Sequence, residues 1–179
     1  MSKLGKINIS VPENVKVAIN GNNINIDGPI GKKTLNLDTD IFDLKINEKK
    51  EISIRPKNIN QETKRLWGMS RSLVNNAIIG ASKGYLKTLE LVGVGYRASL
   101  KGKQLNLQLG FSHDINFDIP EGIKIVVEKQ TILKISGSDK QEVGMITSKI
   151  KSLRPPEPYK GKGIKEVGQY VLRKEGKKK

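Results

Sequence analysis

The chain has 179 residues, of which 33 are lysine or arginine and 18 are acidic, so its formal net charge is +15. An excess of this size indicates a polyanionic partner, either a nucleic acid or an anionic membrane surface. Cysteine is absent, which excludes disulfides, thiolate metal sites and cysteine nucleophiles. Aromatic residues make up only 4%, so aliphatic side chains must fill the core.

The N-terminus, MSKLGKINIS, has no apolar run of the kind found in a signal peptide. No later stretch approaches the ~18 apolar residues that a membrane span requires. We therefore expect a soluble, intracellular protein with a cytoplasmic location.

The first half predicts five strands and a helix. Asn20-Gly21, between two alternating apolar runs, is typical of a hairpin. Asn60 offers an N-cap for a helix over 61–79. The strands are expected at 15–19, 23–27, 34–37, 42–46 and 51–55. The apolar stripe of the helix comprises Leu66, Leu73, Val74, Ala77 and Ile78.

The second half repeats this order. Residues 17–27 align with 98–108 and residues 44–54 with 125–135, both at an offset of 81, and residues 71–73 align with 151–153 at an offset of 80. Such blocks in one order indicate a duplicated unit of five strands and a helix. The hairpin tips Asn20-Gly21 and Lys101-Gly102 should therefore be equivalent.

A second helix is expected to end before Pro155. Ser138 with Gln141, or Asp139 with Glu142, has capping-box spacing. Its apolar stripe comprises Val143, Ile146, Ile150 and Leu153. Because Leu73 and Leu153 align in the repeat, both are expected in the core.

The predicted fold class is α+β, with two tandem duplicated units and a basic C-terminal extension. Each unit is a mainly antiparallel sheet with one helix packed on a face. The expected boundaries are 1–81 for the first repeat, 82–154 for the second, and 155–179 for a basic Pro/Gly/Lys loop and tail attached to the second repeat.

The sequence offers no convincing catalytic or cofactor site. The one histidine, His113, lies in a turn without a second histidine or a cysteine. The GVGYRA run at 93–98 lacks the third glycine of a dinucleotide fingerprint and precedes a strand. Asp38, Asp40 and Asp43 have irregular spacing for calcium. We therefore predict no enzyme, no cofactor, no metal and no small-molecule substrate.

Positive charge is densest in residues 154–179, which contain nine basic and three acidic residues. Pro155, Pro156 and Pro158 exclude a helix here and stiffen the segment, and the glycines make it a poor strand. Gly161 and Gly163 would allow close backbone approach to a phosphate or ribose, and Tyr159 could stack on a base. The basic residues are Arg154, Lys160, Lys162, Lys165, Arg173, Lys174, Lys177, Lys178 and Lys179.

These features favour nucleic acid over a membrane surface, because membrane binding would call for an amphipathic basic helix. A possible second RNA-facing patch lies on the first helix, where Lys64, Gly68 and Arg71 share a face with Asn75. A solvated helix face with a packing glycine is the equally open interpretation of that patch.

The segment RPPEPYKGKGIKE, residues 154–166, resembles the signature of the bacterial large-subunit ribosomal protein L-six family. The resemblance continues in LVGVGYRA (91–98), LQLGFSHDI (107–115), SGSDKQEVG (136–144) and SKLGKINISVPENVKV (2–17). It covers essentially the whole chain.

The resemblance implies two tandem α+β domains that bind large-subunit rRNA on the cytoplasmic ribosome. It further implies a place near the stalk base, beside neighbouring ribosomal proteins and the region where translation factors dock. Pro158, Tyr159, Lys160, Gly161, Lys162, Gly163 and Ile164 match the rRNA-facing segment of the family.

Three departures from the family pattern stand out. Lys165-Glu166 replaces the usual Arg-Tyr, Trp67-Gly68-Met69 replaces His-Gly-Thr, and Asp114 replaces a proline. The predicted function is a structural rRNA-binding protein of the large subunit. The alternatives are a protein–protein adaptor with exposed sheet edges and a general DNA-binding protein.

Overall fold

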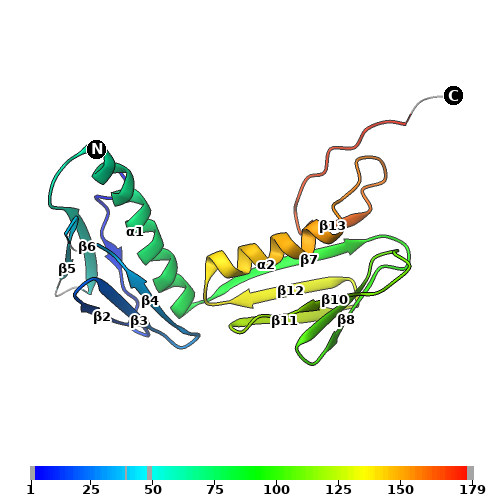
Figure 1. The fold of residues 1–179 in the computed structure, drawn as a ribbon, viewed down its shortest axis with the longest axis horizontal. Coiled ribbons are helices and arrows are strands. Elements are labelled where there is room, and N and C mark those ends of the chain that lie inside the picture. The colour runs from blue at the N-terminus through cyan, green and yellow to red at the C-terminus, as the bar shows by residue number, and fades with distance from the viewer. Residues whose placement is uncertain (1–2, 39, 48–49, 177–179) are drawn as a thin grey trace. The chain divides into compact units, whose positions relative to one another are not determined.

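The computed structural model describes residues 3–38, 40–47 and 50–176, and Figure 1 shows its elements in chain order. The fold divides into two compact units. Unit 1 extends to Gly84 and includes Ser138–Lys140, and unit 2 comprises Tyr85–Gly137 and the chain from Gln141 onward. Within the described ranges, no helix is both long enough and apolar enough to cross a membrane.

Unit 1 contains two three-stranded antiparallel sheets, ordered β2-β3-β4 and β1-β6-β5, and helix α1. The β2–β3 hairpin turns at Gly21, whose φ of 57° suits glycine. The elements are β1 (Ile9–Ser10), β2 (Lys16–Asn20), β3 (Asn23–Asp27), β4 (Lys32–Asn36), β5 (Phe42–Ile46), β6 (Glu51–Pro56) and α1 (Gln61–Ser82).

Unit 2 contains a three-stranded sheet, ordered β10-β9-β8, a four-stranded sheet, ordered β11-β12-β7-β13, and helix α2. All pairings are antiparallel. The elements are β7 (Tyr85–Val92), β8 (Arg97–Lys101), β9 (Gln104–Gln108), β10 (Ile115–Asp118), β11 (Ile123–Glu128), β12 (Ile132–Gly137), α2 (Lys140–Leu153) and β13 (Gly163–Glu166).

The two units repeat one arrangement, as the offset of 81 predicts. Asn20-Gly21 and Lys101-Gly102 lie at the tips of equivalent hairpins, β2–β3 and β8–β9. Among the described residues, the repeat has six strands rather than the predicted five. The additional strand is the short β1 in unit 1 and β7 in unit 2, and each pairs with the last strand of its repeat, β6 or β12. A strand of two residues is too short to show an alternating pattern in the sequence. Among the described residues of unit 1, no strand corresponds to β13.

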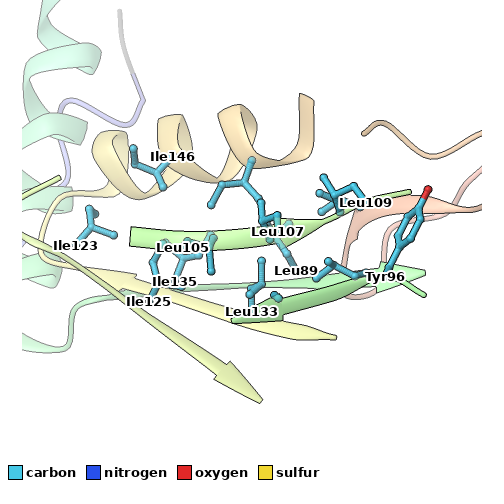
Figure 2. Packing of buried hydrophobic residues seen from close by; sticks show 14 of the residues in the cluster. Leu89, Tyr96, Leu105, Leu107, Leu109, Ile123, Ile125, Leu133, Ile135 and Ile146 are labelled. Atoms are coloured by element: carbon cyan, nitrogen blue, oxygen red, sulfur yellow. The ribbon is translucent and has the colours of Figure 1, made fainter. Parts of the chain in front are cut away.

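Each unit has its own hydrophobic core, built almost entirely from aliphatic side chains. In unit 1, α1 places Val74 and Ile78 against residues such as Ile24 and Ile52. In unit 2, leucines from β7, β9 and β12 belong to the same cluster as Ile146 of α2, and Figure 2 shows part of this cluster. The low aromatic content is therefore reflected directly in how the two cores are filled.

The buried face of α1 differs from the predicted one. It comprises Trp67, Ser70, Val74, Ala77, Ile78, Gly80 and Ala81. Leu73 is only half-buried, because it lies at the edge of the buried arc, about 100° of rotation from Val74. Leu153 is also only partly buried, although it packs against the unit 2 core. The expectation that Leu73 and Leu153 are core residues was therefore wrong.

This difference in burial can be measured within one helix. Ile78→Ala should reduce the free energy of unfolding by roughly 2–5 kcal/mol, since Ile78 is 2% exposed. Leu73→Ala should reduce it by about 1 kcal/mol or less, because part of that side chain already contacts water. Urea unfolding can be followed by fluorescence of Trp67, the one tryptophan of the chain, which lies in the unit 1 core. Equal losses for the two variants would contradict the assigned face.

Candidate nucleic-acid interface

The segment between α2 and β13 forms a closed loop rather than an extended arm. The N–H of Glu157 donates to the carbonyl of Lys162 at 2.8 Å, and the N–H of Ile164 donates to the carbonyl of Arg154 at 2.8 Å. The carboxylate of Glu157 also accepts a hydrogen bond from the N–H of Lys160 at 3.3 Å. These bonds fix the backbone that presents Tyr159, Lys160 and Lys162.

The end of the loop becomes strand β13, which the sequence interpretation did not anticipate. Gly163–Glu166 pairs with Val92–Leu89 of β7, and Ile164 is fully buried in the unit 2 core. Glycine weakens the interior of a strand, but Gly163 stands at the first position of β13, where that penalty is small. The prediction of a poor strand over this stretch was wrong for its last four residues.

Both loop glycines face the chain itself, not an open surface. A Cβ on Gly163 would lie 2.5 Å from the Cα of Pro156, and its φ is 144°. Gly161 has a φ of 70°, and its missing Cβ points toward the guanidinium of Arg173 at 3.6 Å. The glycines therefore allow the loop to close, rather than providing the open backbone that the sequence suggested.

Part of the C-terminal tail returns along the loop. The N–H of Lys174 donates to the carbonyl of Pro158 at 2.8 Å, which brings Arg173 and Lys174 beside Tyr159 and Lys160. Lys177, Lys178 and Lys179 lie outside the described residues. The described tail thus adds two exposed cations to the same surface.

Arg154 is held by residues that the sequence did not single out. Its Nε donates to the hydroxyl of Tyr96 at 3.3 Å, and its guanidinium lies 5.0 Å from the ring centre of Phe111. Phe111 also stacks on His113, with ring centres 6.1 Å apart. Phe111 and Tyr96 lie within LQLGFSHDI and LVGVGYRA, two of the motifs that carried the family resemblance.

A shallow hollow of about 470 Å³ adjoins the loop. Tyr159 is 59% exposed and Val94 is 90% exposed, so both present apolar surface to solvent beside cations. The lining of this hollow also includes Tyr96, Arg154, Lys160 and Lys162. This combination suits stacking on a base together with contacts to phosphate.

The basic residues of this region fall into two groups. Lys165 Nζ lies 3.3 Å from a carboxylate oxygen of Glu90, so its charge is already offset within the chain. Among the described residues, no carboxylate lies within ion-pair distance of four other cations. These are Lys160, Lys162, Arg173 and Lys174.

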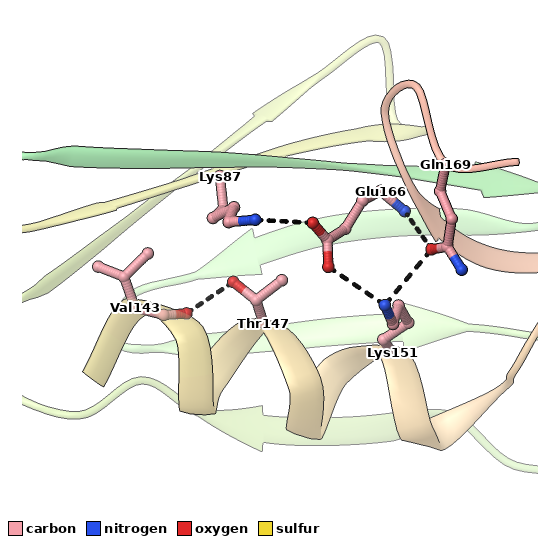
Figure 3. Close-up of polar contacts among 6 residues, drawn as sticks. All are labelled: Lys87, Val143, Thr147, Lys151, Glu166 and Gln169. Atoms are coloured by element: carbon pink, nitrogen blue, oxygen red, sulfur yellow. Dashed lines mark hydrogen bonds and ion pairs between the residues drawn. The ribbon is translucent and has the colours of Figure 1, made fainter. Parts of the chain in front are cut away.

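Glu166 lies at the centre of a polar network at the base of the loop (Figure 3). Its carboxylate is 2.8 Å from Lys87 Nζ and 3.1 Å from Lys151 Nζ. The hydrogen bond from Lys87, followed by that from Lys151, lowers the pKa of Glu166 below its ordinary value of 4.5. The two lysines are therefore held by a charged carboxylate at neutral pH.

The predicted second patch lies on α1 in unit 1. Lys64 is exposed, Gly68 and Arg71 are half-buried, and Arg71 Nε donates to the carbonyl of Ile7 at 3.3 Å. Lys64 borders a hollow of about 410 Å³ together with Lys6, Arg55, Ile59 and Trp67. Nothing in the sequence pattern connected Lys6 or Arg55 with Lys64 of α1, because the three residues come from separate parts of the chain.

Comparison with known proteins identifies one family that matches both halves of the chain. A profile of the family described as Ribosomal protein L6 matches residues 11–84 and again residues 92–167. This chain belongs to the ribosomal protein L6 family. The double match also supports the tandem repeat, since one profile fits both halves.

Full-length members of the family are similar to this chain over its entire length. The proteins named "Large ribosomal subunit protein uL6" from Erythrobacter litoralis and Phenylobacterium zucineum are each 48% identical to it over 179 residues, and that from Sphingopyxis alaskensis is 46% identical. In each case 100% of both chains is covered. Within the described part of this family member, no group of three acidic or histidine side chains is placed to hold a metal ion.

The role of Gly163 can be tested by adding a methyl group. Gly163→Ala should destabilise β13 by about 1–3 kcal/mol, because the new Cβ overlaps Pro155 and Pro156. Gly144→Ala is the matched control: nothing lies within 4 Å of its missing Cβ in α2, so it should stabilise by up to about 1 kcal/mol. Hydrogen exchange of residues 163–166 provides the measurement. Exchange in Gly163→Ala as slow as in the parent would contradict the close packing of Gly163 against Pro155 and Pro156.

The Glu166 network should make unit 2 sensitive to acid. Because the folded pKa of Glu166 is lowered, its stabilising contribution is complete above about pH 4.5 and is lost as the pH falls through the folded pKa. Glu166→Gln should reduce stability at pH 7 by roughly 0.5–2 kcal/mol for two partly exposed pairs. The difference between parent and variant should shrink below pH 4.5 in urea unfolding, and a difference independent of pH would refute the assignment.

Proposed function

We propose that this chain binds folded large-subunit rRNA chiefly through the loop and tail of unit 2. As a member of the L6 family it is a structural component of the large ribosomal subunit, on the cytoplasmic ribosome, with rRNA and ribosomal proteins as its partners. The contact set proposed within the described residues is Arg154, Pro158, Tyr159, Lys160, Lys162, Arg173 and Lys174.

The observation that supports this proposal best is a group of cations beside an exposed tyrosine that have no ion-pair partner among the described residues. Lys160 and Lys162 line the hollow beside Tyr159, and the tail that carries Arg173 and Lys174 is joined to the loop by the hydrogen bond from Lys174 to Pro158. Folded RNA is recognised mainly through phosphates, 2′-hydroxyls and shape. A preformed basic loop suits such recognition, because little conformational freedom is lost when it binds.

Three other predicted site residues support the loop from within. Gly161 and Gly163 allow its close packing, and Lys165 is paired with Glu90. We therefore assign Gly161 and Gly163 to the shape of the loop and Lys165 to the β7–β13 ladder, and none of the three to direct phosphate contact. Lys177, Lys178 and Lys179 remain predicted contacts on the basis of their charge.

We also propose that Lys64, Gly68 and Arg71 of α1 form a second RNA-facing patch, extended by Lys6 and Arg55. The lining of this hollow contains three cations and no acidic residue, which favours a polyanion over an acidic-rimmed protein partner. A position near the stalk base, beside the docking region of translation factors and neighbouring ribosomal proteins, follows from the family resemblance.

Neutralising the loop lysines tests the main proposal. Replacing Lys160 and Lys162 with glutamine should weaken binding and lower the slope of log affinity against log salt by about 2, one for each lost phosphate contact. The binding partner is the rRNA fragment recovered after crosslinking the protein in cell extract, and affinity is measured by filter binding at several salt concentrations.

Lys101→Gln with Lys124→Gln is the matched control. It makes the same change of charge at two exposed lysines near the tip of the β8–β9 hairpin, where Lys124 borders a separate hollow with Gly102. This control should bind like the parent. Equal slopes for the parent and the loop variant would refute the loop as the main contact, and equal affinity for duplex DNA would favour general DNA binding.

A further inference from the structure

Glu166 connects three separate elements of unit 2, as Figure 3 shows. Its carboxylate accepts hydrogen bonds from Lys87 on β7 and from Lys151 on α2. Its own N–H donates to Gln169 Oε1 at 3.3 Å, and Lys151 Nζ donates to the same oxygen at 3.3 Å. Glu166, Lys87, Lys151 and Gln169 are called the Glu166 network below.

The network lies at the base of the candidate RNA-binding loop. The loop leaves α2 after Leu153 and returns at Gly163, so the two elements that the network joins are the two ends of the loop. The pair between Lys151 and Glu166 connects those ends directly. The turn after β13 is fixed by Gln169, whose N–H also donates to the carbonyl of Glu166 at 3.0 Å, and this turn begins the tail that returns along the loop.

We propose that Glu166 is a positioning residue for RNA binding, which holds the ends of the loop together so that Lys160 and Lys162 face the RNA. This inference rests on the function proposed above. The lowered pKa of Glu166 supports it, because the carboxylate keeps its charge and both lysine partners at neutral pH. Glu166 itself need not touch the RNA.

Positioning and simple electrostatics predict opposite changes in RNA affinity when Glu166 is replaced by a neutral residue. Removing one carboxylate from a chain of net charge +15 should strengthen attraction to a polyanion if only the overall charge mattered. Loss of positioning should instead weaken binding, because the loop must then be ordered by the RNA at an entropic cost. The sign of the change therefore separates the two effects.

The chain offers a closely matched control on the same pair of strands. Glu90 of β7 pairs with Lys165 of β13 at 3.3 Å, and its cross-strand partner in the ladder is Lys165. Glu90→Gln removes one carboxylate and one ion pair between β7 and β13, as Glu166→Gln does. It breaks no bond to α2 or to the turn at Gln169.

The experiment compares the parent, Glu166→Gln, Glu90→Gln, the double variant Lys160→Gln/Lys162→Gln, and the triple variant that adds Glu166→Gln. Affinity and salt slope are measured by filter binding with the crosslinked rRNA fragment, and circular dichroism confirms folding. Glu166→Gln should bind about three- to tenfold more weakly than the parent with a reduced salt slope. Glu90→Gln should bind as tightly as the parent or slightly more tightly.

The triple variant tests whether Glu166 acts through the loop lysines. If it does, the triple variant should bind no more weakly than the double variant, since the loop contacts are already lost. If Glu166 had a merely structural role, the triple variant would instead bind more weakly than the double variant. Hydrogen exchange of residues 163–166 should be faster in Glu166→Gln than in Glu90→Gln.

The failures of the two proposals can be told apart. A double variant that binds like the parent overturns the loop as an RNA contact, and with it the positioning of its lysines. A double variant that binds weakly, alongside a Glu166→Gln variant equal to or tighter than the parent, overturns the positioning role alone. An additive loss in the triple variant also overturns it.

Discussion

The pairing of β13 with the outer edge of β7 holds the C-terminal extension in place. Four residues form this ladder, and Ile164 adds a fully buried side chain to the core. Without the ladder, residues 154–176 would attach to unit 2 through the end of α2, the contacts of Arg154 with Tyr96 and Phe111, and the hydrogen bond from Val167 to Thr88. The hydrogen bonds that close the loop and the hollow beside Tyr159 depend on where β13 begins, and the contact between Arg173 and Gly161 also depends on where it ends. A short β-pairing therefore converts a basic tail into a surface of fixed shape.

The duplication shows how one scaffold serves different purposes at equivalent positions. Aligning Arg71 with Lys151 places Trp67 over Thr147. In unit 2, Thr147 donates within its own helix at 2.6 Å, and β7 pairs with β12 over six residues. In unit 1, Trp67 Nε1 donates to the carbonyl of Ile54 at 2.6 Å, and β1 pairs with β6 over only two residues. The indole thus satisfies a carbonyl on a strand edge that is left partly unpaired, which blunts that edge against unwanted pairing.

Features set by local chemistry could be predicted from the sequence, and features set by distant contacts could not. The hairpin at Asn20-Gly21 and the strands 23–27 and 51–55 follow from turn residues and alternation. The site was predicted as a basic, stiff segment, but β13 was missed because its glycines and lysines resemble a loop and its pairing partner lies over 70 residues earlier. Leu73 was misassigned because it lies at the edge of the apolar arc of α1, where periodicity alone does not separate a buried position from a half-buried one. Phe111 and Tyr96 lie in motifs that carried the family resemblance, but nothing in the sequence connected them with Arg154, because that contact spans more than 40 residues of chain.

The distribution of carboxylates around the interface indicates which cations the fold keeps for itself. Lys165 is paired with Glu90, and Lys87 and Lys151 are paired with Glu166. Both acids lie on the β7–β13 ladder, where pairing reduces repulsion between lysines at the base of the loop. Lys165 and Glu166 are also the positions at which the sequence resemblance leads us to expect Arg-Tyr, so an internal ion-pair network stands where an aromatic side chain was expected. The cations of the loop tip and tail have no such partners among the described residues. Their mutual repulsion is a cost in the free chain, and a polyanion bound there, as in the RNA contact proposed above, would relieve it.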